Sequence, residues 1–461
     1  MPTRYRIENP TLTRPLRRIE QLIRRAGGRA WLVGGCVRDL VIGRQPHDLD
    51  IEVLGLQPAR LHALLGEQFP IQFVGKAFAV FKLQGLPIDI SVPSRLVTDN
   101  LSVPGPLRQS DPDMDIDQAL SRRDFTINAM AWDPDTLELR DPFNGRDDLT
   151  AHVLRHASER FAEDPLRVLR GMQLAARFEL TAAPETVDLC RTLTQEGQPK
   201  ERLWQEWRKL ILQGIKPSLG LQFLSDCGWL RFYPELGSLQ GCEQDPAWHP
   251  EGDVWIHTLH CLDWFAMERT NNQDDDLIVG LGILCHDFGK PSTTKREFGH
   301  IMSRGHEPEG AAPTKRFLER LTNQEDLINE VIPLVLCHLR PRALYDAKAS
   351  DGAVRRLARQ VRRIDRLVRV ARADHAGRPP KPFDDFPAGM WLLERARKLD
   401  VEDQVPTPIV MGHHLLELGV QPGPDVGRLL DTCYEAQLDG EFTSVDQGIV
   451  FAKHLLGPRQ S

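Results

Sequence analysis

The stretch Trp31-Leu32-Val33-Gly34-Gly35-Cys36-Val37-Arg38-Asp39 predicts a short apolar strand, a turn of two glycines and the start of a helix. Glycines at such a turn let the backbone approach a ligand closely, and the first helical turn offers free N–H groups to phosphate. Gly34, Gly35 and Arg38 are therefore candidate phosphate-binding residues. Because glycine turns between a strand and a helix are common, the stretch by itself also fits an ordinary structural turn.

The next stretch, Asp48-Leu49-Asp50-Ile51-Glu52-Val53, alternates polar and apolar residues, which is typical of a strand with one buried face. A second strand, Ile88-Asp89-Ile90-Ser91-Val92, repeats the alternation and follows Phe78–Leu83 through a turn, as in a hairpin. If these strands are neighbours, Asp48, Asp50 and Asp89 converge and repel one another unless a cation is present. A strand with a solvated polar face would alternate in the same way.

Carboxylate oxygens favour Mg²⁺, and two such ions about 4 Å apart can activate an attacking hydroxyl and neutralise a leaving pyrophosphate. The aspartates therefore predict polymerase-type phosphoryl transfer.

Further sequence blocks follow in a fixed order: Arg122–Ala129, Glu163–Arg170 and, more weakly, Glu201–Lys209. Together with Gly34–Asp39 and Asp48–Asp50, they resemble the head of the class II CCA-adding enzymes and bacterial poly(A) polymerases, in the polymerase β-like nucleotidyltransferase superfamily. The resemblance implies an α+β fold, in which an N-terminal nucleotidyltransferase palm is followed by helical domains.

The resemblance also implies roles for individual residues. Asp48 and Asp50 would hold the catalytic metals, Asp89 would be the third carboxylate, and all three would be catalytic. The ribose and triphosphate of the incoming nucleotide would contact Arg123, Asp124 and Asn128.

The block around Glu163–Arg170 would select the base of CTP or ATP through Asp164 and Arg167, and Arg170 of this block also counts as nucleotide-binding. Asp164 and Arg167 are three residues apart, so on a helix they would share a face. A carboxylate accepts from an exocyclic amine, while a guanidinium donates to ring nitrogens and carbonyls. An ordinary ion pair on a helix surface would have the same spacing.

The C-terminal half holds histidines and aspartates at the ends or on the faces of predicted helices. The pattern His257, His286-Asp287 and Asp374 resembles the HD phosphohydrolase superfamily, and it implies an all-α HD domain with these residues as metal ligands. Imidazole and carboxylate ligands suit Mn²⁺, Ni²⁺ or Fe²⁺. His306 and His338 are candidates for a second metal position.

Five arginines recur at helical spacing, with Leu357, Val361, Ile364 and Val368 on the other side of the predicted helix. They are Arg355, Arg359, Arg362, Arg366 and Arg369. An uncompensated stripe of this kind would follow an RNA backbone, whereas most charge runs are only solvated faces. Acidic residues cluster elsewhere, for example at Asp274–Asp276.

Composition narrows the class of protein. The 461 residues are 41% hydrophobic and 27% charged, as in soluble globular proteins, and suggest several domains. The net charge of −7 argues against a wholly basic nucleic-acid-binding surface, and the eight cysteines include no CxxC pair. Neither a secretion signal nor an apolar membrane span is apparent, so a cytoplasmic location is expected.

We expect four regions: a palm (1–150), a nucleotide-selecting and RNA-binding helical region (151–240), an HD domain (254–400) and a helical tail (401–461), with 241–253 as a linker. The predicted function is template-independent addition of CCA to tRNA 3′ ends from CTP and ATP, with an HD phosphodiesterase or phosphatase activity. The alternatives are a poly(A) polymerase or A-adding enzyme, a protein whose main activity is the HD hydrolase, and an RNA-binding module without catalysis.

Overall fold

The computed structural model describes residues 7–74, 80–97, 107–381, 383 and 385–456. Its contacts group the chain into two compact units, Met1–Gln198 with Gln222–Gly228, and Pro199–Leu221 with Trp229–Ser461. The four ranges expected from the sequence stay a prediction, since this division is coarser. Among the described residues, no helix is both long and apolar enough to cross a membrane.

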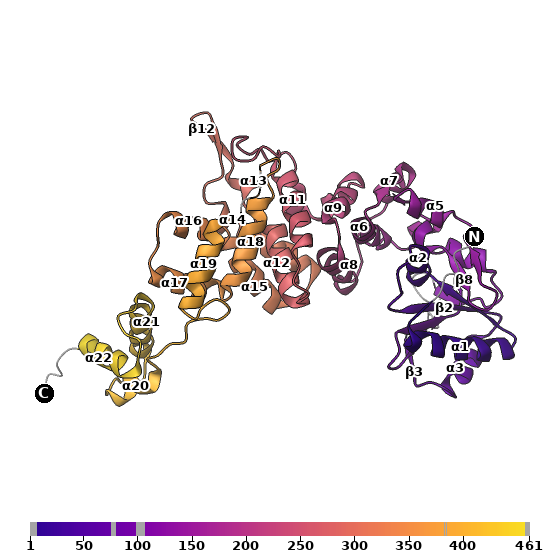
Figure 1. The fold of residues 1–461 in the computed structure, drawn as a ribbon, viewed down its shortest axis with the longest axis horizontal. Coiled ribbons are helices and arrows are strands. Elements are labelled where there is room, and N and C mark those ends of the chain that lie inside the picture. Colours follow the sequence, from indigo (N-terminus) through magenta and orange to yellow (C-terminus); the bar gives the residue numbers. More distant parts are fainter. Residues whose placement is uncertain (1–6, 75–79, 98–106, 382, 384, 457–461) are drawn as a thin grey trace. The chain divides into compact units, whose positions relative to one another are not determined.

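The N-terminal unit combines a mixed sheet with short helices, as the α+β expectation requires (Figure 1). Its strands are β1 (Arg29–Val33), β2 (Leu49–Leu54), β3 (Ile71–Val74), β4 (Val80–Leu83), β5 (Ile88–Ser91), β6 (Ser94–Val97), β7 (Leu107–Ser110), β8 (Ala131–Asp133), β9 (Glu138–Arg140), β10 (Val153–Leu154) and β11 (Thr181–Ala182). Its helices are α1 (Pro10–Arg25), α2 (Gly35–Val41), α3 (Pro58–Gly66), α4 (Ile116–Ser121), η1 (Thr126–Asn128), α5 (Gly145–Thr150), η2 (Glu159–Glu163), α6 (Arg167–Phe178) and α7 (Pro184–Arg191).

The main sheet has seven strands in the order β3-β4-β5-β2-β1-β8-β9. Strands β4 and β5 form the predicted antiparallel hairpin, although Phe78 lies outside the described residues. Strand β2 pairs with β5 in parallel and with β1 in antiparallel orientation. The parallel pairing makes Asp50 and Asp89 register partners, so their side chains emerge side by side on the same face.

The C-terminal unit is almost entirely helical. Its elements are α8 (Lys200–Gln213), η3 (Trp229–Phe232), α10 (Pro234–Gly237), α11 (Val254–Met267), α12 (Gln273–Cys285), α13 (Lys290–Thr293), β12 (Lys295–Glu297), β13 (His300–Met302), α14 (His306–Leu321), α15 (Glu325–Cys337), α16 (Arg340–Asp346), α17 (Asp351–Val361), α18 (Ile364–Ala376), α19 (Pro387–Lys398), α20 (Gly412–Glu417), α21 (Pro424–Asp439) and α22 (Val445–Leu456). Helix α9 (Pro217–Asp226) passes from this unit to the first.

Helix α12 is the central helix of this unit. All residues from Asp276 to Cys285 are buried, and the helix contacts α11, α15 and α18 (Figure 1). A helix that is apolar on every side must be covered on every side, so its C-terminal end lies inside the helical bundle. His286, which follows directly after Cys285, is therefore buried as well.

The five-arginine stripe does not form one basic helix face, and this premise of the RNA-binding prediction is wrong. Helix α17 ends before Arg362, which has a φ of +62°, and α18 begins at Ile364. Arg355 donates to the carbonyl of Leu438. Three of the others pair with acidic side chains: Arg359 with Glu435, Arg366 with Asp275 and Glu330, and Arg369 with Asp276.

Three of the five arginines are therefore paired with carboxylates, and the acidic cluster at the start of α12 supplies the partners of Arg366 and Arg369. The apolar side was predicted correctly, since Leu357, Val361, Ile364 and Val368 are buried.

We expect Arg366→Ala to lower the free energy of unfolding by about 2 kcal/mol, because it leaves two partly buried carboxylates without this partner. The side chain of Arg366 is only 11% exposed. Thermal and denaturant unfolding would measure the loss. Arg428→Ala is the matched control, because the pair of Arg428 with Asp425 is 79% and 71% exposed and should contribute almost nothing. Equal stability of the two variants would contradict the prediction.

Candidate active sites

The predicted glycine turn joins β1 to α2 and requires a glycine at its first position. Gly34 has a φ of +76°, where side chains are strained. A Cβ at Gly34 would lie 2.5 Å from Nη1 of Arg123 and 3.3 Å from Oδ2 of Asp50. The turn therefore brings the backbone into direct contact with two of the predicted site residues.

Gly34→Ala is expected to reduce nucleotide addition at least tenfold, since the strain and clash are worth about 1–3 kcal/mol and fall on Arg123 and Asp50. Gly66→Ala, at the end of α3, is the control, because its Cβ would make only an ordinary contact, with the nearest atom of Ile71 at 3.9 Å. Steady-state kinetics and melting temperatures of the two variants would test this. Equal activity of the two would show that the turn does not shape the site.

The three predicted catalytic aspartates gather at the edge of β2 and β5. Asp50 and Asp89 are register partners, and Asp48 comes just before β2. Desolvation raises the pKa of Asp50, the neighbouring carboxylates of Asp48 and Asp89 raise it further, and the Arg123 guanidinium opposes both. Nζ of Lys82 lies 2.8 Å from Oδ2 of Asp89. A cluster in which two neighbouring carboxylates raise the pKa of Asp50 is a donor set suited to a divalent cation.

Glu52 is buried, whereas the alternation of the strand predicted that it lies on a solvated face. It is only 9% exposed and lies 3.6 Å from Nη2 of Arg123. Arg123 thus lies between Glu52 and Asp50. Desolvation raises the pKa of both carboxyls, and the Arg123 guanidinium offsets only part of this rise. The sequence alternation could not reveal this burial, because it depends on Arg123, which comes from a later block.

Residues of three sequence blocks join in a buried network. Nη1 of Arg38 donates to Oδ1 of Asn128 at 2.7 Å, and Nδ2 of Asn128 donates to Oδ1 of Asp124 at 3.1 Å. Arg170 lies 2.8 Å from Oδ2 of Asp124. Burial alone would raise the pKa of Asp124, but Arg170, the Phe125 N–H and Asn128 outweigh it and lower the pKa. The network connects α2, η1 and α6.

Arg38 is 5% exposed, and its guanidinium lies over the ring of Phe178 at 4.1 Å. In this structure it positions Asn128; its predicted contact with the triphosphate stays a prediction.

The expectation that Asp164 and Arg167 share one helix is wrong. Asp164 is extended, with φ −140° and ψ 99°, and α6 begins only at Arg167. Oδ1 of Asp164 accepts from the N–H of Leu166 at 3.2 Å, which holds the turn before the helix. The Arg167 guanidinium is buried and donates to the carbonyls of Arg160 and Arg122. Asp164 thus accepts from the backbone of its own turn, whereas Arg167 donates to carbonyls of two earlier segments of the chain.

The predicted HD residues cluster beside a cavity of about 370 Å³ in the C-terminal unit, which Asp287 and Asp374 line. His257 lies on α11, His286 and Asp287 follow α12, and Asp374 lies on α18. Nε2 of His257 lies 3.1 Å from Oδ1 of Asp374, and Nε2 of His286 lies 3.2 Å from Oδ2 of Asp287. Four predicted ligands from three helices therefore gather at one place.

His306 and His338 belong to the same cluster. Their Nε2 atoms are 3.2 Å apart, and Nε2 of His306 is 3.5 Å from Oδ1 of Asp287. Burial and the neighbouring His286 lower the pKa of His338 to about 3, so its imidazole is neutral, as a metal ligand must be. Ligand atoms of Asp287, His306 and His338 all lie within 4.8 Å of one another. The residues present fit a divalent transition metal.

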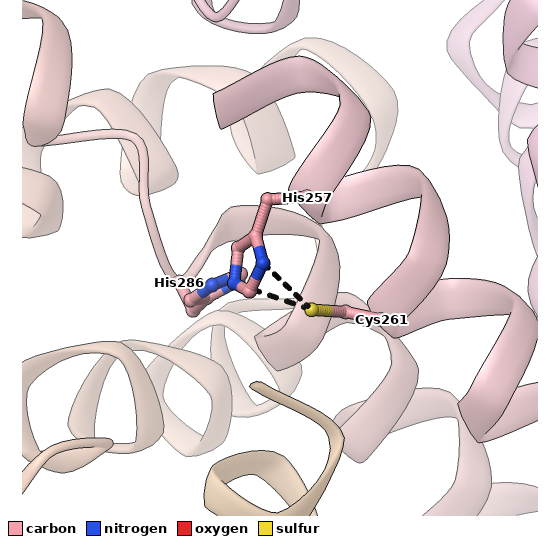
Figure 2. Close-up of side chains that lie close together, drawn as sticks. All are labelled: His257, Cys261 and His286. Carbon is pink, nitrogen blue, oxygen red and sulfur yellow. Dashed lines mark hydrogen bonds between the residues drawn. The ribbon is translucent and has the colours of Figure 1, made fainter. Parts of the chain in front are cut away.

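Figure 2 shows Cys261, one turn after His257 on α11, with its thiol directed at the imidazole: Sγ is 3.4 Å from Nε2. Burial raises the pKa of this thiol, so Cys261 is a protonated neighbour of the cluster.

The sequence pattern missed several residues of this cavity. Nζ of Lys290 lies 2.8 Å from Oδ2 of Asp287, and Nη2 of Arg378 lies 3.0 Å from Oδ1 of Asp374. Both follow a predicted ligand within one helical turn, and this spacing was the available signal. The segment expected to be a linker also reaches the cavity, where His249 lines the wall and Glu251 contacts two histidines.

Comparison with known proteins places the N-terminal unit in a class. Residues 30–155 match the family model of the poly A polymerase head domain. Together with the sheet and its three aspartates, this defines the chain as an enzyme of the nucleotidyltransferase class.

Two curated relatives cover most of the chain. The multifunctional CCA protein of Laribacter hongkongensis is 34% identical over 374 residues, which is 78% of this chain and 87% of the relative. That of Xanthomonas oryzae pv. oryzae is 35% identical over 383 residues, which is 79% of this chain and 89% of the relative. The chain belongs to the family of multifunctional CCA proteins.

Solved structures of low identity share the fold. The Bacillus stearothermophilus CCA-adding enzyme, solved in complex with CTP, is 21% identical with a TM-score of 0.67 and covers 97% of this chain and 98% of its own. The Thermotoga maritima CCA-adding enzyme, solved in complex with tRNA, is 19% identical with a TM-score of 0.57 and covers 97% of this chain and 96% of its own.

Proposed function

We propose that this protein adds C, C and A to the 3′ end of tRNA, using CTP and ATP and no nucleic-acid template. The observation that carries the proposal is the side-by-side placement of Asp50 and Asp89, next to Asp48 and the glycine turn. The multifunctional CCA proteins and the CCA-adding enzymes with CTP, ATP or tRNA support the choice of substrates. A cytoplasmic location would fit a tRNA substrate.

Asp48, Asp50 and Asp89 would hold Mg²⁺, because hard oxygen donors suit this ion. When bound, Mg²⁺ would lower the pKa of the attacking 3′-hydroxyl and neutralise the leaving pyrophosphate. The residues around it position the nucleotide: Arg123 offers a cation beside Asp50, and the α2 N-terminus offers N–H groups to phosphate.

Asp164 and Arg167 would select the base by hydrogen bonding, which requires the Arg167 guanidinium to exchange its carbonyl partners for the base edge.

The test is to supply a tRNA that lacks its 3′ CCA with Mg²⁺, CTP and ATP, and to sequence the products. Addition of C-C-A is the expected result. Addition of A alone, or of long A tails, would keep the mechanism but identify an A-adding enzyme or a poly(A) polymerase. No addition would refute the transferase function and leave the HD site as the main activity.

Arg167→Ala is expected to reduce the preference for CTP and ATP over UTP and GTP by about 10–100-fold, because a site built on hydrogen bonds to the base loses about 1–3 kcal/mol of discrimination. Competition assays with all four nucleotides would measure the ratio. Arg167→Lys is the control for charge, since a lysine cannot reproduce the forked donor. Unchanged selectivity in the Ala variant would rule out the template role.

A second proposed activity is hydrolysis of phosphate esters at the HD cavity. His257, His286, Asp287 and Asp374 would hold Mn²⁺, Ni²⁺ or Fe²⁺, with His306 and His338 completing a second position. Such an ion supplies an activated water. A phosphodiesterase or phosphatase acting on RNA ends would fit the substrate of the transferase. Assays of phosphodiester hydrolysis with each metal would test it.

A further inference from the structure

A buried carboxylate outside the predicted ligand set bonds two imidazoles at the wall of the HD cavity. Oε1 of Glu251 lies 2.8 Å from Nδ1 of His249 and 2.8 Å from Nδ1 of His257. Its side chain has no exposed surface, and Oε2 is buried without a hydrogen-bond partner among the described residues. A carboxylate buried in this way is costly unless neighbouring N–H groups stabilise its charge.

The contacts of His257 fix which of its nitrogens carries the proton. Nδ1 faces two acceptors, the Glu251 carboxylate and the carbonyl of Gly377 at 3.1 Å, so Nδ1 is the N–H. Nε2, which lies 3.1 Å from Oδ1 of Asp374, is then the nitrogen left to coordinate an ion beside that carboxylate. In metal sites, a carboxylate on the far nitrogen of a ligating histidine sets the tautomer and raises its basicity.

The same carboxylate orients His249. With Nδ1 bound to Glu251, the ring of His249 stands at 84° to that of His257, with 4.9 Å between centroids. His249 lines the cavity together with Lys290 and Arg378, which are the cations of its wall. Its Nε2 is the nitrogen left for a ligand. Because Nδ1 donates to Glu251, Nε2 would accept a hydrogen bond from a P–OH group of a bound hydrogen phosphate or phosphomonoester.

We propose that Glu251 is a positioning residue that sets the tautomer of His257 for metal binding, and that His249 contacts the substrate phosphate. The inference rests on the proposed hydrolase function of the HD site. A different arrangement, in which His249, Glu251 and His257 themselves hold an ion, fits these contacts less well. The Nδ1 atoms of both histidines lie at hydrogen-bond distance from one oxygen, and a proton on either would block coordination.

The test uses the full chain carrying Asp48→Ala and Asp50→Ala, so that the transferase carboxylates bind no metal. Mn²⁺ is titrated calorimetrically into this protein and into its Glu251→Gln and His249→Asn variants, and inorganic phosphate is then titrated into the Mn²⁺-loaded forms. Gln keeps the shape of Glu251 without its charge. Asn at position 249 places an amide N–H near the position of Nδ1, so it keeps the contact to Glu251. It lacks Nε2, so it removes the proposed contact to phosphate.

Glu251→Gln is expected to weaken Mn²⁺ binding about 10–100-fold. His249→Asn should leave Mn²⁺ affinity unchanged and weaken phosphate binding about tenfold. If Glu251→Gln does not fold, as judged by thermal unfolding, Glu251→Asp is used with the same expectation, because its shorter side chain cannot reach both rings.

Unchanged Mn²⁺ affinity in Glu251→Gln would overturn the positioning role. So would a Glu251→Gln protein that binds one Mn²⁺ ion fewer per chain but binds its other ions as tightly as before, because Glu251 would then itself be a ligand. Unchanged phosphate affinity in His249→Asn would overturn the phosphate contact. If the protein without HD-site substitutions binds Mn²⁺ and phosphate but hydrolyses no bis(p-nitrophenyl) phosphate, the hydrolase function fails while the binding results still decide the roles of Glu251 and His249.

Discussion

Nucleotide addition by Asp50→Ala is expected to fall by about 10³-fold or more, because the variant loses one of the three carboxylates that we propose would hold Mg²⁺. Asp50 is the member of the cluster whose pKa is raised by desolvation and by both neighbouring aspartates. Removing it relieves the repulsion of Asp50 with Asp48 and with Asp89, so the melting temperature should stay level or rise. Single-turnover addition of CMP to a tRNA lacking CCA would measure the loss.

The matched control is Asp188→Ala, which removes an aspartate of the same unit that is 71% exposed and pairs with Arg191 on its own helix. This variant should add nucleotides at the normal rate. Any hydrolysis at the HD cavity should continue in Asp50→Ala, because that cavity lies wholly in the C-terminal unit. Retained addition in Asp50→Ala would refute the metal assignment.

The second large effect is expected at Asp287. Asp287→Asn should lower phosphodiester hydrolysis by about 10³-fold and remove metal from the HD site, since a neutral amide is a poor ligand for these ions. Burial would raise the pKa of Asp287, but His286 and Lys290 outweigh it and hold the pKa well below its usual range, so the group is an anion. Metal content and hydrolysis, measured together, would test the prediction.

Asn is preferred to Ala at Asp287 because Lys290 would otherwise lose its partner in a buried position. Asp326→Ala, at an exposed position in the first turn of α15, is the control. CCA addition should be unchanged in both variants. Loss of addition in Asp287→Asn alone would show that the two activities are coupled, and full hydrolysis would exclude Asp287 as a ligand.

The sequence by itself determined the local structure and the residue types of both sites. The alternation of Asp48–Val53 predicted β2 and the buried face of Leu49, Ile51 and Val53, and the structure confirms it. The histidines were correctly placed at helix ends, as at the C-terminal ends of α12 and α15. Such features follow from periods of two and 3.6 residues, which a short window of sequence already contains.

Only the tertiary structure decided what these local elements face. The parallel pairing of β2 with β5 brings Asp89 beside Asp50, and no local period specifies the partner of a strand. Arg366 and Arg369 look like a basic stripe along the chain, but the start of α12 supplies their acidic partners. Glu251 lies in a segment without periodicity and gains its role because the fold places it against His257. Charge and hydrogen bonding act between atoms close in space, so residues far apart in sequence determine whether a side chain is solvated, neutralised or aimed at a ligand.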